Sequence, residues 1–312
     1  MDEPVYSIPP DTIVHSELMV VQGAVPWTRP ESVMQPIWAA GVDGRGCIGI
    51  NLDTGWRKHV DLPEPLAARN FVGGAASDVT DRHGHGNHCI GSMVGRNGIG
   101  GAPAAMLKVG KVLGDSGSGS GTTAGLEWAA REEGDVVSCS WGSNGTYVDP
   151  RTTKALQAVE ESGKWIVFAA GNAGYNGRNS VGSPAVSPHN LACASLNRDL
   201  TLSGFSSGGP AVDIAAGGGM ILSAGLRNDR VMMSGTSMAT PTAVGDLLLL
   251  RQVMKALGMS TYMDSRGLVK FLTSEEFLKD AGPVGRDPRY GDGIITTANI
   301  LAWIKSKQPE FL

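Results

Sequence analysis

The segment DRHGHGNHCIG, residues 81–91, contains three histidines within six positions: His83, His85 and His88. Imidazoles at this spacing can converge on a metal ion, and a single imidazole can also act as a general base. The Glu that metal hydrolases carry beside their histidines, as in H-E-x-x-H, is missing from this segment. The local pattern therefore leaves a metal site, a catalytic base and ordinary packing open.

Two further segments place reactive side chains at the ends of expected elements. Asp53 ends the apolar run CIGINLD, and Ser237 lies in GTSMATP at the start of a long apolar helix pattern. Backbone N–H groups at a helix start stabilise negative charge. With His85, these residues supply the orienter, base and nucleophile that acyl transfer requires.

Strands and helices must alternate to bring these residues together. Short apolar runs bounded by Gly, Asp or Asn predict strands, and amphipathic runs predict helices. Strand–helix alternation favours a doubly wound, mostly parallel sheet with helices on both faces, whose sites lie at the carboxyl ends of the strands. The expected strands are 47–53, 106–114, 135–142, 164–172 and 189–196, and the expected helices are 121–133, 149–163, 234–258 (with Pro241 in its first turn), 266–273 and 296–306.

The ordered motifs LDTG, HGNH, AAGN and SGTSMATP resemble the subtilisin family of serine proteases, most closely the intracellular subtilisins, from about residue 25 to 300. The resemblance implies a single-domain α/β serine endopeptidase at 25–312, after an extension at 1–24. It implies Asp53 as orienter of the histidine, His85 as general base, Ser237 as nucleophile and Asn172 as side-chain donor of the oxyanion hole. His88 is then structural, and His83 is a local substitution.

The resemblance also implies how a peptide would bind. The substrate would lie as an added strand between 117–121 and 140–142, and its side chains would enter pockets beside that strand. Because the pocket residues are small and neutral, we expect apolar or aromatic side chains before the scissile bond. The implied substrate-binding residues are Gly117, Ser118, Gly119, Ser140, Trp141, Gly142, Ala169, Ala170, Gly171 and Gly182.

Composition limits the partners. The formal charge is −4 and no basic run occurs, so nucleic acid and membrane surfaces are not expected partners. The expected partners are polypeptide substrates. Four widely spaced cysteines in apolar contexts predict buried free thiols, and the acidic, proline-rich start is unlike a signal peptide. We therefore expect a cytoplasmic protein.

No cofactor is expected for catalysis. The segment 94–103 is short where many subtilisin relatives carry a calcium loop, and it offers Asn97 but no carboxylate, so a structural calcium is not supported there. Asn87 stands where the family usually has Thr, and Thr242 where it usually has His. Neither is a triad position, so activity is still expected.

The extension carries VYSIPPDT, which resembles the proline-bearing inhibitory motif of intracellular subtilisins. Tyr6 and Ile8 can fill apolar pockets, while Pro9 and Pro10 lack the N–H that strand pairing uses. We expect residues 1–14 to occupy the cleft; a disordered tail is the competing interpretation.

Other functions remain open beside the protease. A peptide ligase or macrocyclase would use the same triad, a zinc hydrolase would use His83, His85 and His88, and a catalytically silent binding module would use neither. The G-x-S-x-G match GFSSG around Ser206 is not followed by a helix pattern, so Ser206 is expected to be a turn residue.

Overall fold

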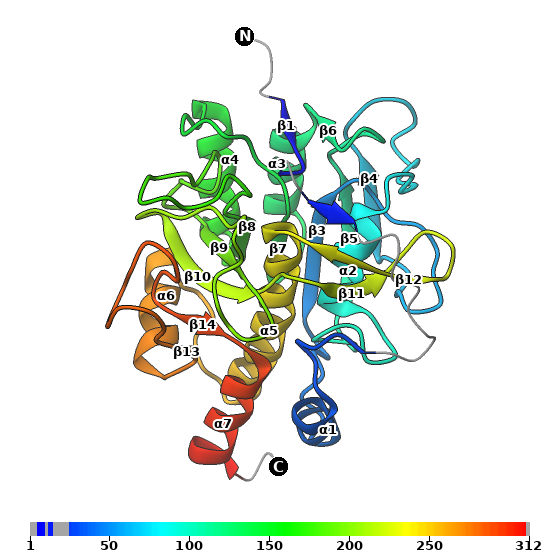
Figure 1. Ribbon diagram of the computed structural model, residues 1–312. Helices are drawn as coiled ribbons and strands as arrows, with labels where there is room; N and C mark the ends of the chain where they lie inside the picture. The colour runs from blue at the N-terminus through cyan, green and yellow to red at the C-terminus, as the bar shows by residue number, and fades with distance from the viewer. Residues whose placement is uncertain (1–4, 10–11, 15–24, 310–312) are drawn as a thin grey trace.

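The computed structural model describes residues 5–9, 12–14 and 25–309, and its centre in this part of the chain is a nine-stranded sheet (Figure 1). The strand order is β13-β14-β10-β9-β8-β7-β3-β5-β4, and all neighbours are parallel except β13 and β14. The strands are β3 (Ile48–Asp53), β4 (Ala67–Asn70), β5 (Met106–Lys111), β7 (Val136–Cys139), β8 (Trp165–Ala169), β9 (Leu191–Leu196), β10 (Val212–Gly217), β13 (Leu278–Lys279) and β14 (Ile294–Ile295).

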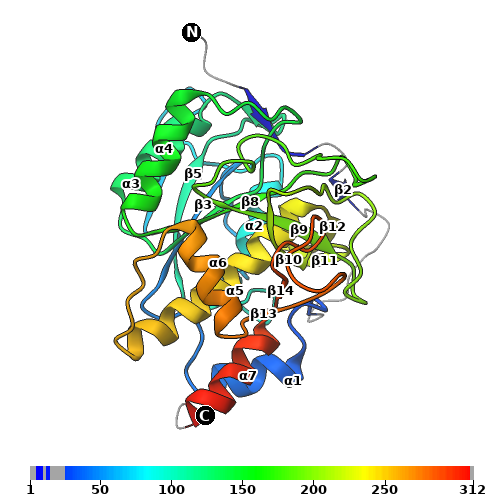
Figure 2. The same ribbon diagram turned by 90° about the vertical axis from the view of Figure 1, so that its left-hand side faces the viewer.

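Helices cover both faces of this sheet (Figures 1 and 2). Helices α2 (His85–Val94) and α5 (Thr236–Ala256) pack on one face, with α1 (Glu31–Ala39), α6 (Ser265–Ser274) and α7 (Thr297–Lys307) around them, and α3 (Thr122–Arg131) and α4 (Pro150–Glu161) pack on the other. Strand β8 shows why two layers are needed. Trp165 and Val167 enter one core and Ile166 and Phe168 the other, because alternate side chains point to opposite faces. The predicted doubly wound α/β fold is confirmed.

Two small sheets involve the N-terminal segment. Strand β1 (Tyr6–Ser7) pairs antiparallel with β6 (Ser118–Gly119). Strand β2 (Ile13–Val14) pairs antiparallel with β12 (Arg230–Ser234), which also pairs with β11 (Ile221–Ala224). The extension is therefore fixed at two points by backbone pairing.

One helix boundary differs from the sequence prediction. Helix α5 begins at Thr236, so Pro241 is its sixth residue and lies in the second turn, not the first. Proline has no N–H to donate to the carbonyl four residues earlier, which is that of Ser237. The prediction about Pro241 was wrong, and the carbonyl that it leaves without a helical donor is that of Ser237, the predicted nucleophile.

None of the helices in the described ranges has both the length and the apolar character needed to cross a membrane.

Candidate active site

The four predicted catalytic residues come from separate elements that meet at one edge of the sheet. Asp53 is the last residue of β3, and Asn172 follows β8 at the same, carboxyl end of the parallel strands. His85 is the first residue of α2 and Ser237 the second residue of α5. The side chains are buried, with exposed fractions of 0–3%.

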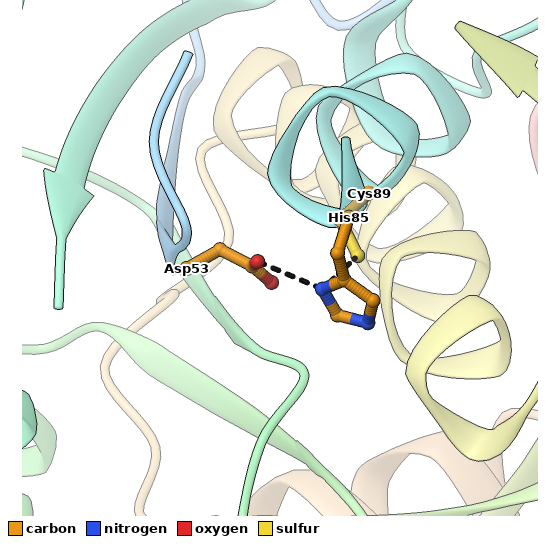
Figure 3. Close-up of side chains that lie close together, drawn as sticks. All are labelled: Asp53, His85 and Cys89. Atoms are coloured by element: carbon orange, nitrogen blue, oxygen red, sulfur yellow. Dashed lines mark hydrogen bonds and ion pairs between the residues drawn. The ribbon is translucent and has the colours of Figure 1, made fainter. Parts of the chain in front are cut away.

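Asp53 and His85 form a direct pair (Figure 3). The Asp53 Oδ1 lies 2.7 Å from His85 Nδ1 and also accepts a hydrogen bond of 2.7 Å from the Thr54 N–H. His85 Nε2 has no hydrogen-bond partner within the described residues. An imidazole that donates Nδ1–H to a carboxylate presents Nε2 as a base, so this pair has the orientation that proton abstraction requires.

The pair also fixes the protonation preference of the histidine. Burial opposes the charged imidazolium, but the Asp53 carboxylate overrides it and holds the pKa of His85 above its ordinary value. The Cys89 thiol lies near the same ring nitrogen, with Sγ 3.8 Å from Nδ1 (Figure 3). Burial raises the pKa of Cys89, so this neighbour is a neutral thiol.

Ser237 is held by hydrogen bonds to its backbone carbonyl, which Pro241 leaves without a helical donor. Its carbonyl, which receives no helical N–H from Pro241, accepts from the Ser140 hydroxyl at 2.9 Å and from Cys89 Sγ at 3.5 Å. The Ser237 Oγ donates to the Ser140 carbonyl at 3.1 Å. The structure therefore does not join Ser237 Oγ to His85 Nε2 by a hydrogen bond. Such bonds commonly form only when substrate is bound.

Asn172 is oriented by a residue that the sequence reasoning missed. Its Oδ1 accepts from the Thr236 N–H at 3.0 Å and from the Thr236 hydroxyl at 2.9 Å. The amide Nδ2 is thereby directed toward the cleft, where it lies 3.5 Å from Thr12 Oγ1. Thr236 directly precedes Ser237, the predicted nucleophile, and this position was the available signal.

The three histidines do not gather into a metal site. Within the part of the chain that the structure describes, the group with metal-binding geometry is Asp53, His85 and Cys89. His88 is fully buried and donates Nε2–H to the Ile221 carbonyl at 3.0 Å, and burial lowers its pKa to about 3. His83 lies on the loop before α2, with its ring centroid 6.2 Å from that of His85.

The N-terminal extension occupies the predicted peptide groove. Ser7 exchanges two backbone hydrogen bonds with Gly142, of 3.0 and 2.8 Å, and the Ile8 N–H donates to the Gly117 carbonyl at 2.8 Å. Tyr6, only 2% exposed, packs on Trp141 with ring centroids 5.3 Å apart. Residues 6–8 thus form the added strand expected of a substrate between 117–119 and 142.

Pro9 enters the predicted primary pocket. It lines a cavity of about 10 Å³ together with the expected residues Gly142, Ala169, Ala170, Gly171 and Gly182. Two predicted pocket residues lie elsewhere. Ser140 is fully buried against Ser237, and Trp141 packs beneath Tyr6 and donates Nε1–H to the Leu52 carbonyl, so neither lines this cavity.

The Pro9 carbonyl is the group that a protease would attack if the extension bound as a substrate. It accepts instead from the Thr12 N–H at 3.4 Å and the Thr12 hydroxyl at 3.0 Å. The Thr12 hydroxyl also lies 3.5 Å from the Asn172 amide nitrogen. Pro10, named in the sequence prediction, lies outside the described residues.

Comparison with known proteins gives consistent matches. Residues 48–293 match the model of the "Subtilase family". The chain is 35% identical over 301 residues to a "Subtilisin-like protease 1" of Trichophyton verrucosum, covering 90% of this chain and 72% of that protein. It is 32% identical to a "Thermostable alkaline protease" of Halalkalibacterium halodurans, covering 75% and 64%. A longer "Subtilisin-like protease 1" of Trichophyton verrucosum is matched over 55% of its length.

Proposed function

Because the chain belongs to the subtilase family and is a subtilisin-like serine endopeptidase, we propose that Asp53, His85 and Ser237 are its catalytic triad and Asn172 its oxyanion donor. The Asp53–His85 contact of 2.7 Å, made at the strand edge where Ser237 and Asn172 also lie, is the observation that carries this proposal.

In the proposed mechanism, Ser237 Oγ leaves the Ser140 carbonyl by rotation about χ1 and transfers its proton to His85 Nε2 while it attacks the peptide carbonyl. Asp53 stabilises the imidazolium that forms. The Asn172 amide and the Ser237 N–H donate to the oxyanion. His85 then returns the proton to the leaving amine, and water hydrolyses the acyl-enzyme by the same sequence.

A serine-directed phosphonyl reagent tests the proposal against the metal alternative. We expect peptide hydrolysis to stop when one phosphonyl group is attached to the peptide that contains Ser237, as mass spectrometry identifies it, and to continue in the presence of a chelator. Activity that is lost with the chelator and untouched by the reagent would favour the zinc hydrolase instead.

We also propose apolar or aromatic specificity for the P1 residue, which is the residue before the scissile bond. The cavity that Pro9 lines is built from small, neutral residues, among them Ser183, and none of its lining residues carries an acidic group. A chromogenic peptide series that varies P1 is the check, and preference for Lys or Arg would contradict the proposal.

The pH dependence follows from the raised pKa of His85. The base must be neutral, so kcat/KM is expected to rise as the pH passes upward through a His85 pKa that lies above the ordinary value of about 6.5. A pH profile of kcat/KM with a P1-Phe peptide measures it. A half-maximal value at or below about pH 6.5 would show that the Asp53 charge does not dominate.

We propose that the extension inhibits the enzyme. It fills the groove as a substrate would, but its Pro9 carbonyl accepts from the Thr12 N–H and hydroxyl, and the Thr12 hydroxyl is the group that meets the Asn172 amide. A tethered segment acts at millimolar effective concentration, so even a weak contact can compete with substrate.

A chain that begins at His15 is expected to cleave a short chromogenic peptide at least about tenfold faster than the full chain at low substrate concentration, since nothing tethered competes for the groove. In the full chain, Tyr6→Ala should act in the same direction, because it removes the packing on Trp141. Tyr262→Ala is the matched control, since Tyr262 is 66% exposed. Equal kinetics for the full and shortened chains would leave the extension without an inhibitory role.

We propose further that an arginine takes the place of a calcium ion beside the short 94–103 loop. Asp61, which is buried, accepts from Arg230 Nε at 2.9 Å and Nη2 at 3.2 Å and from Asn97 Nδ2 at 2.7 Å. Burial would raise the pKa of Asp61, but these bonds hold it below its usual value. Arg230 also donates to the Asn97 carbonyl at 3.2 Å, so one guanidinium links the carboxylate to the loop.

Arg230→Ala is expected to lower the free energy of unfolding by about 3 kcal/mol, because it leaves a buried carboxylate without its charged partner. Arg45→Ala is the control: the Arg45 side chain is 66% exposed, so loss of its ion pair with Asp43 should change the stability much less than Arg230→Ala does. Chelator should leave the Tm of the unsubstituted protein unchanged. A Tm that rises with calcium and falls with chelator would contradict the proposal.

A further inference from the structure

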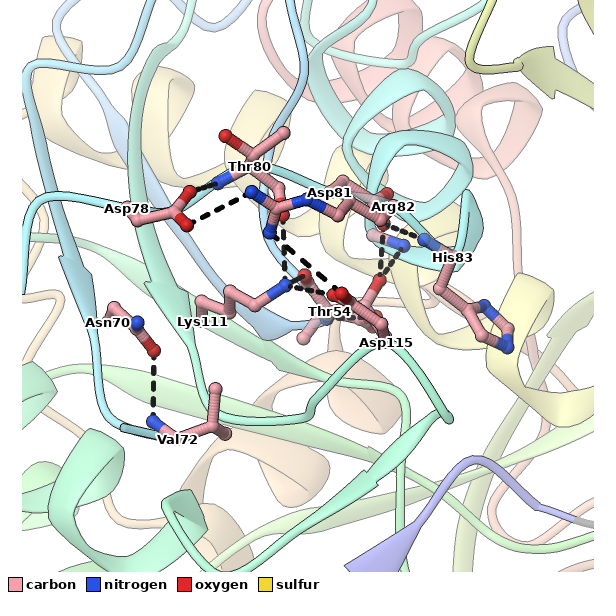
Figure 4. Close-up of polar contacts among 12 residues, drawn as sticks. Thr54, Asn70, Val72, Asp78, Thr80, Asp81, Arg82, His83, Lys111 and Asp115 are labelled. Carbon is pink, nitrogen blue, oxygen red and sulfur yellow. Dashed lines mark hydrogen bonds and ion pairs between the residues drawn. The ribbon is translucent and has the colours of Figure 1, made fainter. Parts of the chain in front are cut away.

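His83 is the one histidine of the cluster that neither the triad nor the core uses. It is exposed on the loop before α2. Its backbone N–H donates to Asp81 Oδ1 at 2.9 Å, and Figure 4 shows the imidazole turned away from the polar network that surrounds that carboxylate. Within residues 5–9, 12–14 and 25–309, the ring makes no hydrogen bond or ion pair.

The ring borders the place of the side chain that precedes P1. A β-carbon built on Gly117 would lie 2.9 Å from Ile8 Cδ1 and 3.1 Å from His83 Nε2. Ile8 and His83 therefore meet over the same glycine. Since Pro9 lines the primary pocket and the Ile8 N–H bonds to the Gly117 carbonyl, Ile8 stands at the P2 position of a bound peptide.

We propose that His83 is a specificity-determining residue for the P2 side chain of the substrate. Its neutral imidazole accepts an apolar P2 side chain, and its protonated form adds a preference for an acidic one. This inference rests on the proposed protease function and names the residue that would tune it. Neutral and charged imidazole are both accessible near physiological pH, so the preference would change with the acidity of the surroundings.

The charges around His83 leave its ring available to a substrate. The ionisable groups that act on it are His85 on α2, Asp53 at the end of β3, Asp81 on its own loop and Asp115 after β5. Partial desolvation and the nearby His85 lower the pKa of His83, so the ring becomes charged only on the acidic side of neutrality. Asp53 is bonded to His85, and Asp81 accepts from Thr54 and from backbone N–H groups.

Asp115 is neutralised by other cations. Lys111 Nζ lies 2.8 Å from its Oδ1, and Arg82 lies 3.9 Å from its Oδ2, as the network in Figure 4 shows. A carboxylate at P2 would therefore meet an imidazolium whose nearby acidic groups are already paired. An exposed pair of this kind contributes little but measurable affinity, about two- to fivefold.

Internal competition between two peptides tests the proposal in the full chain. The peptides share the sequence Tyr-Ser-Xaa-Phe before a chromogenic group, with Xaa either Glu or its neutral isostere Gln, and both are present in one reaction. The ratio of their consumption gives the ratio of kcat/KM. Because both peptides meet the same enzyme, titration of His85 and occupancy of the groove by the extension cancel.

We expect the Glu/Gln ratio to be about two- to fivefold higher at about pH 5 than at about pH 8, and to be independent of pH in the variant His83→Asn. A ratio that does not change with pH in the unsubstituted chain would overturn the proposal. So would a pH dependence that survives in His83→Asn, since another group would then be responsible.

A second measurement needs no turnover. In full chains carrying Ser237→Ala together with Ile8→Glu or Ile8→Gln, the ring signals of His83 are followed by NMR and assigned by their loss in His83→Asn. His83 should titrate at a higher pH beside the Glu than beside the Gln, and identical titrations would overturn the proposal. A chain that hydrolyses neither peptide contradicts the proposed function alone, and this measurement then decides the His83 inference.

Discussion

Replacing Ser237 by alanine is expected to lower kcat by about 10⁶-fold, the loss known for the nucleophile of subtilisin, a member of the same family. The reason is that no other group can form the acyl-enzyme. His85 and Asp53 remain paired without Ser237, and the residual rate comes from the oxyanion donors and from binding. The measurement is kcat on a P1-Phe chromogenic peptide, with the intact fold checked by Tm.

Ser206→Ala is the matched control. Ser206 lies in the GFSSG segment, is fully buried, and accepts from the Ser195 N–H at 3.0 Å. Within the described residues its hydrogen bonds go to Ser195, Ser203 and Ser207 and not to the proposed triad, so its replacement should affect stability and leave kcat within a few-fold of the unsubstituted enzyme. A loss in Ser206→Ala as large as that in Ser237→Ala would mean that the wrong serine has been assigned.

The sequence motifs were sufficient to predict which residues meet at the strand edge. Asp53 and His85 are 32 positions apart, yet the predicted end of one strand and start of one helix place them in hydrogen-bond contact. This succeeds because the carboxyl ends of parallel strands lie at one edge, whatever the chain between them does. The same apolar runs also predict a hydrophobic core on each face of the sheet, as the alternating side chains of β8 show.

Features that depend on tertiary contacts were not predictable in this way. Helix α1 contains Pro36, which lowers the helical signal, and the β11–β12 hairpin is short and gains its stability from packing on α2. The effect of Pro241 on Ser237 also depends on residues that are distant in the sequence and close in space. The Ser237 carbonyl that it leaves free is bonded by Ser140 and Cys89, which belong to other segments of the chain.

The peptide groove also contains one feature that the sequence predicted and one that it could not predict. The apolar residues and prolines of the extension predicted occupancy, and backbone pairing of residues 6–8 agrees with it. The sequence could not predict that Thr12 bonds to the Pro9 carbonyl, because that contact depends on tertiary structure. This bond is what distinguishes a bound inhibitor from a substrate in the proposed mechanism.

Asn172→Ala is expected to lower kcat by about 10²- to 10³-fold with little change in KM, because the amide bonds the oxyanion and not the ground-state carbonyl. The magnitude is that known for the corresponding side-chain donor of subtilisin. In this chain the donor is held by Thr236 through two hydrogen bonds to Oδ1. Thr236→Val removes one of them and should lower kcat by about tenfold, since the backbone bond remains and the Asn172 donor is only less well fixed. If Asn172→Ala raised KM and left kcat unchanged, Asn172 would be a binding residue and the oxyanion would have to be held elsewhere.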